Sequence, residues 1–260
     1  MDKLIVVKIG GNLIDDSTAL QSFLKSFAAV PEKKLLIHGG GKLATDLAGK
    51  LNLPQQMIDG RRITDSQTLN LVTMVYAGLI NKTIVASLQS FGTNALGLTG
   101  ADGNCIRAHK RTGSVDFGFA GDVDEVNAEF LKQLLRSVCT PVLAPITHDK
   151  KGQLLNTNAD TIAQEVAAAL SADFEVDLVY CFEKEGVLLH ADDEASVIPT
   201  LQPQQYEELR ESGAIFAGMI PKLDNAFNAI SRGVSSVIIG NGTKLEQLLD
   251  TTSGTRVINE

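Results

Sequence analysis

Short apolar runs alternate with helical stretches along almost the whole chain of 260 residues. The first run, Leu4–Val7, precedes a stretch after Asp16 whose apolar residues recur every three or four positions, as on one face of a helix. Strands separated by helices usually pair in parallel, with helices on both faces of the sheet. We therefore predict an α/β fold, a three-layer α/β/α sandwich with a mostly parallel central sheet. No linker interrupts the chain, so we expect two lobes, 1–175 and 176–260, to share one continuous sheet.

Three segments give more specific predictions. Leu43, Leu47 and Leu51 predict the buried stripe of a second helix. Residues 66–91 predict one long helical region that can bend. Residues 101–126 are rich in glycine and aspartate and have weak apolar periodicity, so we expect hairpins or loops there.

Charge and composition exclude several classes of protein. A formal net charge of −8 and a pI near 5.1 argue against nucleic-acid binding, which needs a basic surface stripe. We find no signal pattern and no apolar run near the roughly 20 residues that span a bilayer. We therefore expect a cytoplasmic protein that contacts neither nucleic acid nor membrane. The scattered Cys105, Cys139 and Cys181 fit neither a disulfide framework nor a metal site.

Two predicted strands end in glycines. Lys8 is followed by Ile-Gly-Gly at 9–11, and His38 is followed by three glycines at 39–41 and then by a helix. Exposed backbone N–H groups beside a helix N-terminus suit a phosphate. Tight turns remain an alternative, as does a dinucleotide-binding G-x-G-x-x-A match at Gly39, Gly41 and Ala44. The P-loop pattern G-x-x-x-x-G-K-[ST] is absent from the sequence.

Several charged or polar residues stand where loops are expected. Arg61 and Arg62 follow a turn, and an arginine can hold a carboxylate with two parallel hydrogen bonds, although a solvated surface pair is the alternative. The segment 156–160, Asn-Thr-Asn-Ala-Asp, precedes a helix that it could simply cap. Lys222 follows Pro221 in the first turn of a predicted helix, where the helix dipole disfavours a cation unless an anion binds nearby.

Six short motifs follow one another along the chain: KIGG (8–11), HGGG (38–41), GRRIT (60–64), NTNAD (156–160), EGVL (185–188) and GMIPKL (218–223). In these motifs the chain resembles the amino acid kinase superfamily over essentially its whole length. The combination of HGGG, R-x-T and N-x-N-A-D is similar to the branch that acts on N-acylglutamates, rather than to the aspartate, carbamate or uridylate kinases.

The resemblance implies the amino acid kinase fold and transfer of the ATP γ-phosphoryl group to the side-chain carboxylate of N-acetyl-L-glutamate, or of a closely related N-acylglutamate. The product would be an acyl phosphate in arginine biosynthesis, with Mg2+ arriving on the nucleotide and no metal bound by protein ligands. The first lobe would bind the acyl amino acid and form a homodimer, and the second would bind ATP. The implied roles are catalysis by Lys8, Lys222 and Asp160; phosphoryl binding by Gly10, Gly11 and Gly40; substrate binding by Gly40, Gly41, Arg62 and Asn156; and nucleotide binding by Glu183, Gly186 and Lys222.

The sequence departs from the family pattern in two places. Glu183 stands where relatives usually carry Asp, three residues before Gly186, and we expect its longer side chain to alter the nucleotide contacts or the loop geometry. The sequence also begins almost at its first strand, without the leading helix that builds a hexamer in arginine-inhibited relatives. We therefore expect a homodimer that arginine does not inhibit.

Two alternatives remain open. One is a kinase for another N-acyl amino acid, for instance an N-succinyl one, or for a free dicarboxylic amino acid. The other is a ligand sensor on the same fold that binds ATP without turnover.

Overall fold

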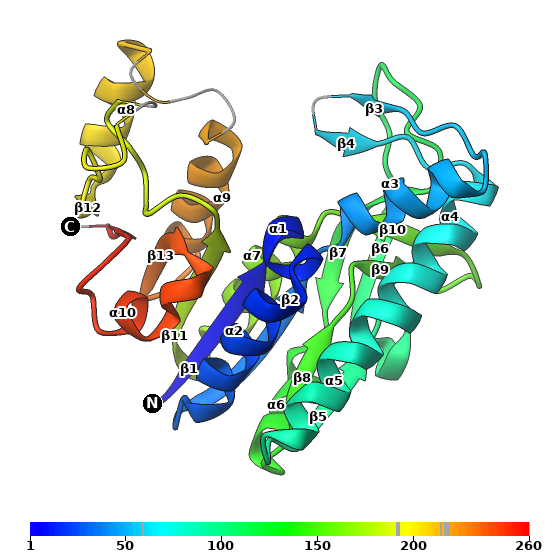
Figure 1. Cartoon of the computed structure of the whole chain (residues 1–260), viewed down its shortest axis with the longest axis horizontal. Helices are drawn as coiled ribbons and strands as arrows, with labels where there is room; N and C mark the ends of the chain where they lie inside the picture. The colour runs from blue at the N-terminus through cyan, green and yellow to red at the C-terminus, as the bar shows by residue number, and fades with distance from the viewer. Residues whose placement is uncertain (59, 191–192, 214, 216–218, 260) are drawn as a thin grey trace.

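An eight-stranded sheet runs through the middle of the molecule in the order β12-β14-β13-β11-β1-β2-β8-β5 (Figure 1). The structure is a computed structural model that describes residues 1–58, 60–190, 193–213, 215 and 219–259. At the centre, β1 (Asp2–Ile9) pairs in parallel with β11 (Phe174–Phe182) and with β2 (Lys33–His38). The lobes on either side of residue 175 therefore share this sheet.

The outer strands of the sheet are no longer than β2. They are β5 (Ala95–Leu98), β8 (Thr140–Leu143), β12 (Thr200–Leu201), β13 (Ser236–Asn241) and β14 (Thr255–Val257). Strands β13 and β14 pair antiparallel, and the other neighbouring pairs are parallel. The prediction of a mostly parallel sheet is confirmed.

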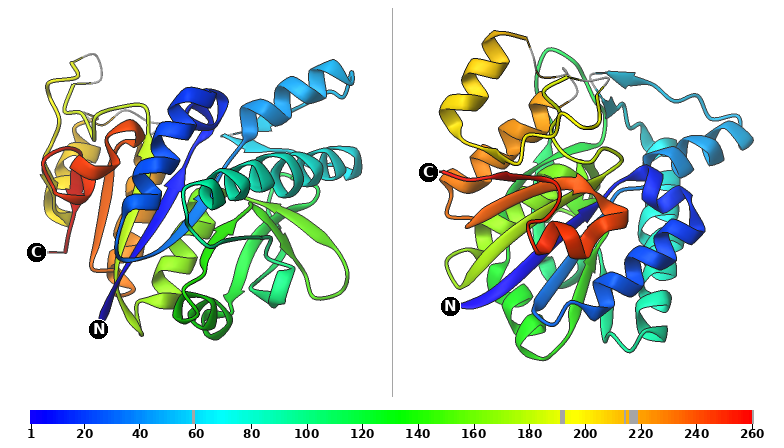
Figure 2. Two further views of the ribbon diagram at one scale, coloured as in Figure 1. Left: turned by 60° about the horizontal axis from the view of Figure 1, so that its bottom comes forward. Right: turned by 60° about the vertical axis from the view of Figure 1, so that its left-hand side comes forward.

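Helices cover both faces of this sheet, which makes the three layers visible in Figure 2. One face carries α1 (Gly11–Asp15), α2 (Ser17–Ala29), α3 (Gly41–Lys50), α4 (Ser66–Thr73), the π-helical segment η1 (Met74–Ile80), α5 (Asn81–Ser90) and α10 (Leu245–Leu249). The other face carries α6 (Ala128–Arg136), α7 (Ala159–Leu170), α8 (Pro203–Glu211) and α9 (Ile220–Ser231).

Alternation along β1 explains why both layers can form. Successive side chains on a strand point to opposite faces, so Leu4 and Val6 join the core under α7 and α9, while Ile5 and Val7 join the core under α2. All four side chains are at most 1% exposed. Each such burial contributes about 1.5–3 kcal/mol, so the continuous apolar run of β1 holds both helical layers to the sheet.

The helix α3 buries a different face from the predicted one. Ala44 and Ala48 are fully buried, whereas Leu51 is 52% exposed and Leu43 and Leu47 are only partly buried. The predicted helix is therefore confirmed, but the prediction that Leu51 belongs to its apolar stripe is wrong, because Leu51 follows the last residue of α3 and is exposed. The small alanine side chains let α3 approach its neighbours closely, so the leucines lie at the margin of the contact.

The predicted long helical region is confirmed as the continuous segment Ser66–Ser90, made of α4, η1 and α5. By length and composition this helix could cross a membrane, so the expectation that no stretch is apolar enough is wrong here. Val72, Val75, Ile84 and Leu88 are buried in the core that α2 also covers. The apolarity of this segment thus serves the contact between the helix and the sheet.

A small four-stranded barrel adjoins the sheet. It contains β6 (Ile106–Lys110), β7 (Ala120–Val126), β9 (Ile146–His148) and β10 (Leu154–Thr157). Strands β6 and β7 pair antiparallel, which confirms the hairpin prediction for residues 101–126; closure into a barrel was not predicted.

A separate hairpin of β3 (Met57–Ile58) and β4 (Arg61–Arg62) stands near α3 in Figure 1. Two 3-10 turns, η2 (Asp102–Asn104) and η3 (Gly242–Lys244), complete the elements.

Candidate active site

A cavity of about 230 Å3 lies at the carboxyl ends of β1 and β2, where loops of a parallel sheet converge. Its lining includes most of the predicted site residues: Lys8, Gly10, Gly11, Gly40, Gly41, Arg62, Asn156 and Asp160. These residues come from β1, β4, β10, α7 and the two glycine loops, so one edge of the fold gathers distant parts of the chain.

Two lysines from opposite ends of the chain contact one carboxylate. Lys8 Nζ, at the end of β1, lies 2.6 Å from Asp160 Oδ1. Lys222 Nζ, in the first turn of α9, lies 3.1 Å from Asp160 Oδ2. The Lys8 side chain is only 12% exposed, and this ion pair offsets the cost of burying its charge. Asp160 therefore fixes the two ammonium groups beside each other at the mouth of the sheet.

The charge state of Asp160 follows from these contacts. Burial alone would raise the pKa of Asp160, but the charges and hydrogen bonds of Lys8 and Lys222 outweigh it and lower the pKa to about 2. The carboxylate is thus ionised at neutral pH. One negative charge between two positive ones leaves a local surplus of one positive charge, which suits an incoming anion.

The second glycine loop is packed against the long helix. Gly40 has φ of +143°, a conformation that favours glycine. A side chain there would overlap Ile80 and stand 3.2 Å from the ring of Tyr76. Gly41 opens α3, whose first N–H groups have no partner within the helix and can bind an anion.

His38 supports this loop from beneath. It is fully buried, its Nδ1 lies 2.8 Å from the Gly39 carbonyl, and its Nε2 lies 3.2 Å from Asn81 Nδ2. Because the carbonyl can only accept and the amide nitrogen can only donate, His38 is neutral with its proton on Nδ1. Burial lowers the pKa of His38 to about 4. The histidine therefore has a structural role, as a link between the glycine loop and the long helix.

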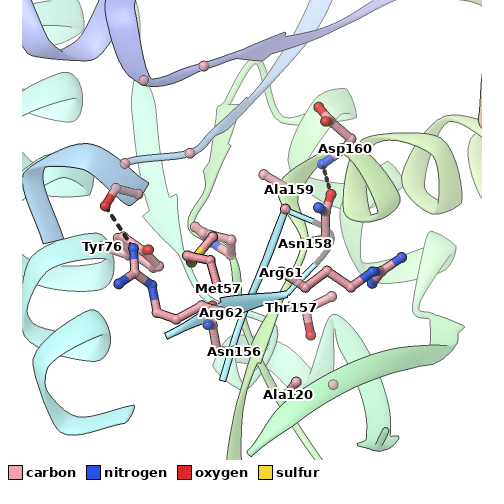
Figure 3. A pocket seen from close by; sticks show the side chains of 18 of the residues that line it. Met57, Arg61, Arg62, Tyr76, Ala120, Asn156, Thr157, Asn158, Ala159 and Asp160 are labelled. Carbon is pink, nitrogen blue, oxygen red and sulfur yellow. Dashed lines mark hydrogen bonds between the residues drawn. The ribbon is translucent and has the colours of Figure 1, made fainter. Parts of the chain in front are cut away.

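Arg62 is held firmly at the side of the cavity. It is 7% exposed, and its Nη2 donates to the Gly41 carbonyl at 2.9 Å, the hydrogen bond drawn at Arg62 in Figure 3. The same nitrogen donates to Thr45 Oγ1 at 2.9 Å. Its Nη1 donates to Gln55. The guanidinium is thus fixed next to the glycine loop before any substrate arrives, and the interpretation of Arg62 as a solvated surface residue is wrong.

The segment 156–160 both caps a helix and supplies the site. Asn158 Oδ1 accepts from the backbone N–H groups of Asp160 at 2.8 Å and of Thr161 at 3.2 Å, so the predicted capping is confirmed. The cap turns Asp160 into the first turn of α7. Asn156 Nδ2 donates to Thr64 Oγ1 at 3.0 Å, which ties β10 to the chain that follows Arg62.

The predicted nucleotide residues separate into two groups. Glu183 lines a neighbouring cavity of about 300 Å3 that shares Gly10 and Gly11 with the first. Gly186 is instead buried, and a side chain there would crowd Val197 and Thr255. The motif that contains Lys222 begins at Gly218, which lies outside the described residues.

Among the ionisable residues that line the first cavity, three were not predicted as site residues: Arg61, Tyr76 and Arg111. The resemblance assigns the carboxylate of the substrate to Arg62 and gives Arg61 no role. Tyr76 lies within a helical repeat that looks like ordinary core. Arg111 lies in the region of weak periodicity, where no local signal distinguishes it from other surface cations.

Comparison with known proteins agrees with this geometry. A model of the amino acid kinase family matches residues 3–241. An acetylglutamate kinase of Cytophaga hutchinsonii is 55% identical, and the alignment covers 99% of both chains. An acetylglutamate kinase of Parabacteroides distasonis is 52% identical over 99% of this chain and 100% of its own. The crystal structure of smu.665 from Streptococcus mutans UA159 matches with a TM-score of 0.81 and 28% identity over 99% of both chains. The chain therefore belongs to the amino acid kinase family, in the group of the acetylglutamate kinases.

Proposed function

We propose that this chain catalyses the ATP-dependent phosphorylation of the side-chain carboxylate of N-acetyl-L-glutamate, or of a closely related N-acylglutamate, to an acyl phosphate in arginine biosynthesis. The observation that carries the proposal is the pair of ammonium groups on Asp160. Relatives that are 52% and 55% identical over nearly the whole chain bear the name acetylglutamate kinase.

The reaction needs positioning and charge neutralisation more than acid–base chemistry. A glutamate side chain with an ordinary pKa of about 4.3 is already ionised near pH 7, so no general base is required. The attacking carboxylate and the γ-phosphate repel each other as they approach. Lys8 and Lys222 would neutralise the charge on the moving phosphoryl oxygens, and the N–H groups of Gly10, Gly11 and Gly40 would hold these oxygens in place.

The substrate would lie across the first cavity. Arg62 would hold the α-carboxylate, and its fixed guanidinium would reduce the entropy lost on binding. Gly40, Gly41 and Asn156 would contact the rest of the acylated amino acid. The lobe 1–175 would thus bind the acceptor.

ATP would bind on the lobe 176–260, with Glu183 and Lys222 near its phosphates and with Gly186 shaping the adjoining loop. Within the described residues, no group of three or more His, Cys, Asp or Glu side chains could hold a metal ion. Mg2+ would therefore enter on the nucleotide phosphates, where it would neutralise part of their charge. We further propose that the protein is cytoplasmic and that it forms a homodimer. The dimer would assemble through the first lobe.

An ADP-release assay tests the proposed function. ATP and N-acetyl-L-glutamate should give ADP together with an acyl phosphate that hydroxylamine traps as a hydroxamate. Lys8→Met should lower kcat by about 100-fold, because loss of one charge-stabilising donor costs on the order of 3 kcal/mol. Binding of ATP without ADP release would instead favour the sensor alternative, and equal rates on free L-glutamate would contradict the acylglutamate assignment.

A further inference from the structure

Two arginines of the first cavity have no part in the mechanism above. Arg61 extends from β4 in the direction opposite to Arg62 (Figure 3). Arg111 follows β6, and its guanidinium carbon lies 5.6 Å from the centre of the Phe117 ring. Both line the same cavity as Lys8 and Arg62, although they come from the hairpin and the barrel, respectively.

These two guanidinium groups form a positive cluster with one partial counterion. Arg111 Nε lies 3.6 Å from Asp122 Oδ2, and its side chain is 26% exposed. Among the residues that the structure describes, no carboxylate lies within 4.0 Å of the Arg61 guanidinium. Partial burial and the charge of Arg111 lower the pKa of Arg61, whereas Asp122 acts in the opposite direction. Among the described residues, two cations and one carboxylate leave a surplus of one positive charge on this wall.

N-acetylglutamate cannot use that surplus charge. Its side-chain carboxylate must lie at the glycine loops, where Lys8 is, and its α-carboxylate would lie at Arg62. Both of its negative charges are then matched, and its acetyl group is neutral. The wall formed by Arg61 and Arg111 would face this uncharged group, and two like charges would be partly desolvated without an anion between them.

We propose that the acyl group preferred by this site ends in a carboxylate, which Arg61 and Arg111 bind together. The substrate is then an N-acylglutamate whose acyl group comes from a short dicarboxylic acid, with three carboxylates in all. This inference rests on the proposed kinase function and specifies its substrate. Arginine suits this role because its planar donors match a carboxylate and its charge persists at any physiological pH.

Three substrates separate charge recognition from size. We would measure kcat and KM for N-acetyl-L-glutamate, for N-succinyl-L-glutamate, and for the neutral analogue in which an amide replaces the terminal carboxylate of the succinyl group. The succinyl substrate should exceed both others in kcat/KM by at least tenfold. The difference should lie mainly in KM, because the terminal carboxylate is bound equally before and during phosphoryl transfer.

Variants then test the two arginines. Arg61→Gln and Arg111→Gln should each lower the ratio of kcat/KM for the succinyl substrate over the acetyl substrate by about tenfold. Arg61→Lys should restore part of that ratio because it keeps the charge. Lys110→Gln is the matched control: Lys110 is the last residue of β6, next to Arg111, and pairs with Asp116 at 3.3 Å. It is not among the residues that line the cavity, so the ratio should not change.

The outcomes distinguish failure of the inference from failure of the proposed function. A preference for the acetyl substrate, equal use of the amide analogue, or an equal loss on all substrates in Arg61→Gln would overturn the dicarboxylic acyl group while leaving the kinase intact. Release of no ADP with any of the three substrates would overturn the kinase proposal and this inference together.

Discussion

At the scale of single residues, Asp160 determines whether the two lysines can stand side by side. In Asp160→Asn the amide oxygen can accept from one ammonium group only, and the NH2 group would face the other. We expect kcat to fall about 100-fold with little change in KM for the acylglutamate, because in the proposed mechanism the lysines would act on the moving phosphoryl group. Steady-state kinetics measures both constants.

The control for this variant is Asp173→Asn, which removes a surface ion pair with Lys132 at 3.0 Å and lies far from the cavity. It should leave both constants unchanged. A rise in KM with kcat preserved in Asp160→Asn would mean that Asp160 serves substrate binding instead of the phosphoryl group.

His38 gives stability a pH dependence of known sign. Its pKa is about 4 in the folded protein, against about 6.5 when unfolded, so between these values the unfolded chain binds more protons. The contribution of His38 to the free energy of unfolding is complete above pH 6.5. It declines as the pH falls towards 4, by about 3 kcal/mol in all. The free energy of unfolding, measured by urea unfolding, should fall less between pH 7.5 and pH 4.5 in His38→Gln than in the natural protein.

That comparison removes the contribution of the carboxylates, which titrate in both proteins. Equal losses in the two proteins would show that His38 is accessible to protons in the folded state, and so that its link to Asn81 and Gly39 is open in solution.

At the scale of elements, the contact of Gly40 with Ile80 and Tyr76 fixes the glycine loop against the long helix, and in the proposed mechanism this loop would position the phosphoryl group. In Gly40→Ala the new methyl group must displace Ile80 or move the loop, and φ of +143° adds strain. In Gly39→Ala the methyl group stands 3.6 Å from the Ile9 carbonyl oxygen and 4.0 Å from Gly10 Cα, which are ordinary van der Waals contacts. We expect Gly40→Ala to lower kcat/KM by at least 100-fold and Gly39→Ala by less than tenfold.

Circular dichroism and thermal unfolding would verify that both variants fold. Similar activity in the two variants would refute the view that steric contact with Ile80 and Tyr76 positions this loop.

The elements also show how far the sequence predicts the fold. The spacing of Leu20, Phe23, Leu24 and Phe27 predicts the buried face of α2, and all four side chains are at most 6% exposed. In α3 the same rule misses the most buried positions. Ala44 and Ala48 have the same four-residue spacing as Leu43 and Leu47, so periodicity alone cannot tell which pair is buried more deeply. The alanine pair is buried because its small side chains let the helix lie closer to the core.

Long-range pairing limits what could be predicted of the site. Lys8 and Lys222 stand out because each breaks a local rule, a lysine in a core strand and a cation at a helix N-terminus. Asp160 breaks none, since an acid in the first turn of a helix is favourable, and its role is implied only by the resemblance to the amino acid kinases. Arg111 breaks no local rule. It reaches the cavity only because the barrel closes through pairs such as Asn156 with Ala120, and no local pattern encodes that closure.

At the scale of the whole molecule, one side of the first lobe leaves apolar side chains exposed. Met74 is 61% exposed and Leu79 56% exposed on the long helix, Phe91 is 36% exposed at its end, and Leu96 is 39% exposed on the edge strand β5. An edge strand beside exposed apolar residues is a usual place for self-association. These side chains support the proposal that the homodimer forms through this side.

We therefore expect light scattering to give twice the chain mass of 27.7 kDa for the natural protein and one chain mass for Leu79→Asp. A buried charge without a partner costs several kcal/mol at an interface, and a twofold axis would place two copies of it there. Leu189→Asp is the control, since Leu189 is 39% exposed in the second lobe and its substitution should leave the mass doubled. Because Lys8, Asp160 and Lys222 come from one chain, the Leu79→Asp monomer should keep its ADP release per chain. A mass near six chains, or a dimer that survives Leu79→Asp, would place the interface elsewhere.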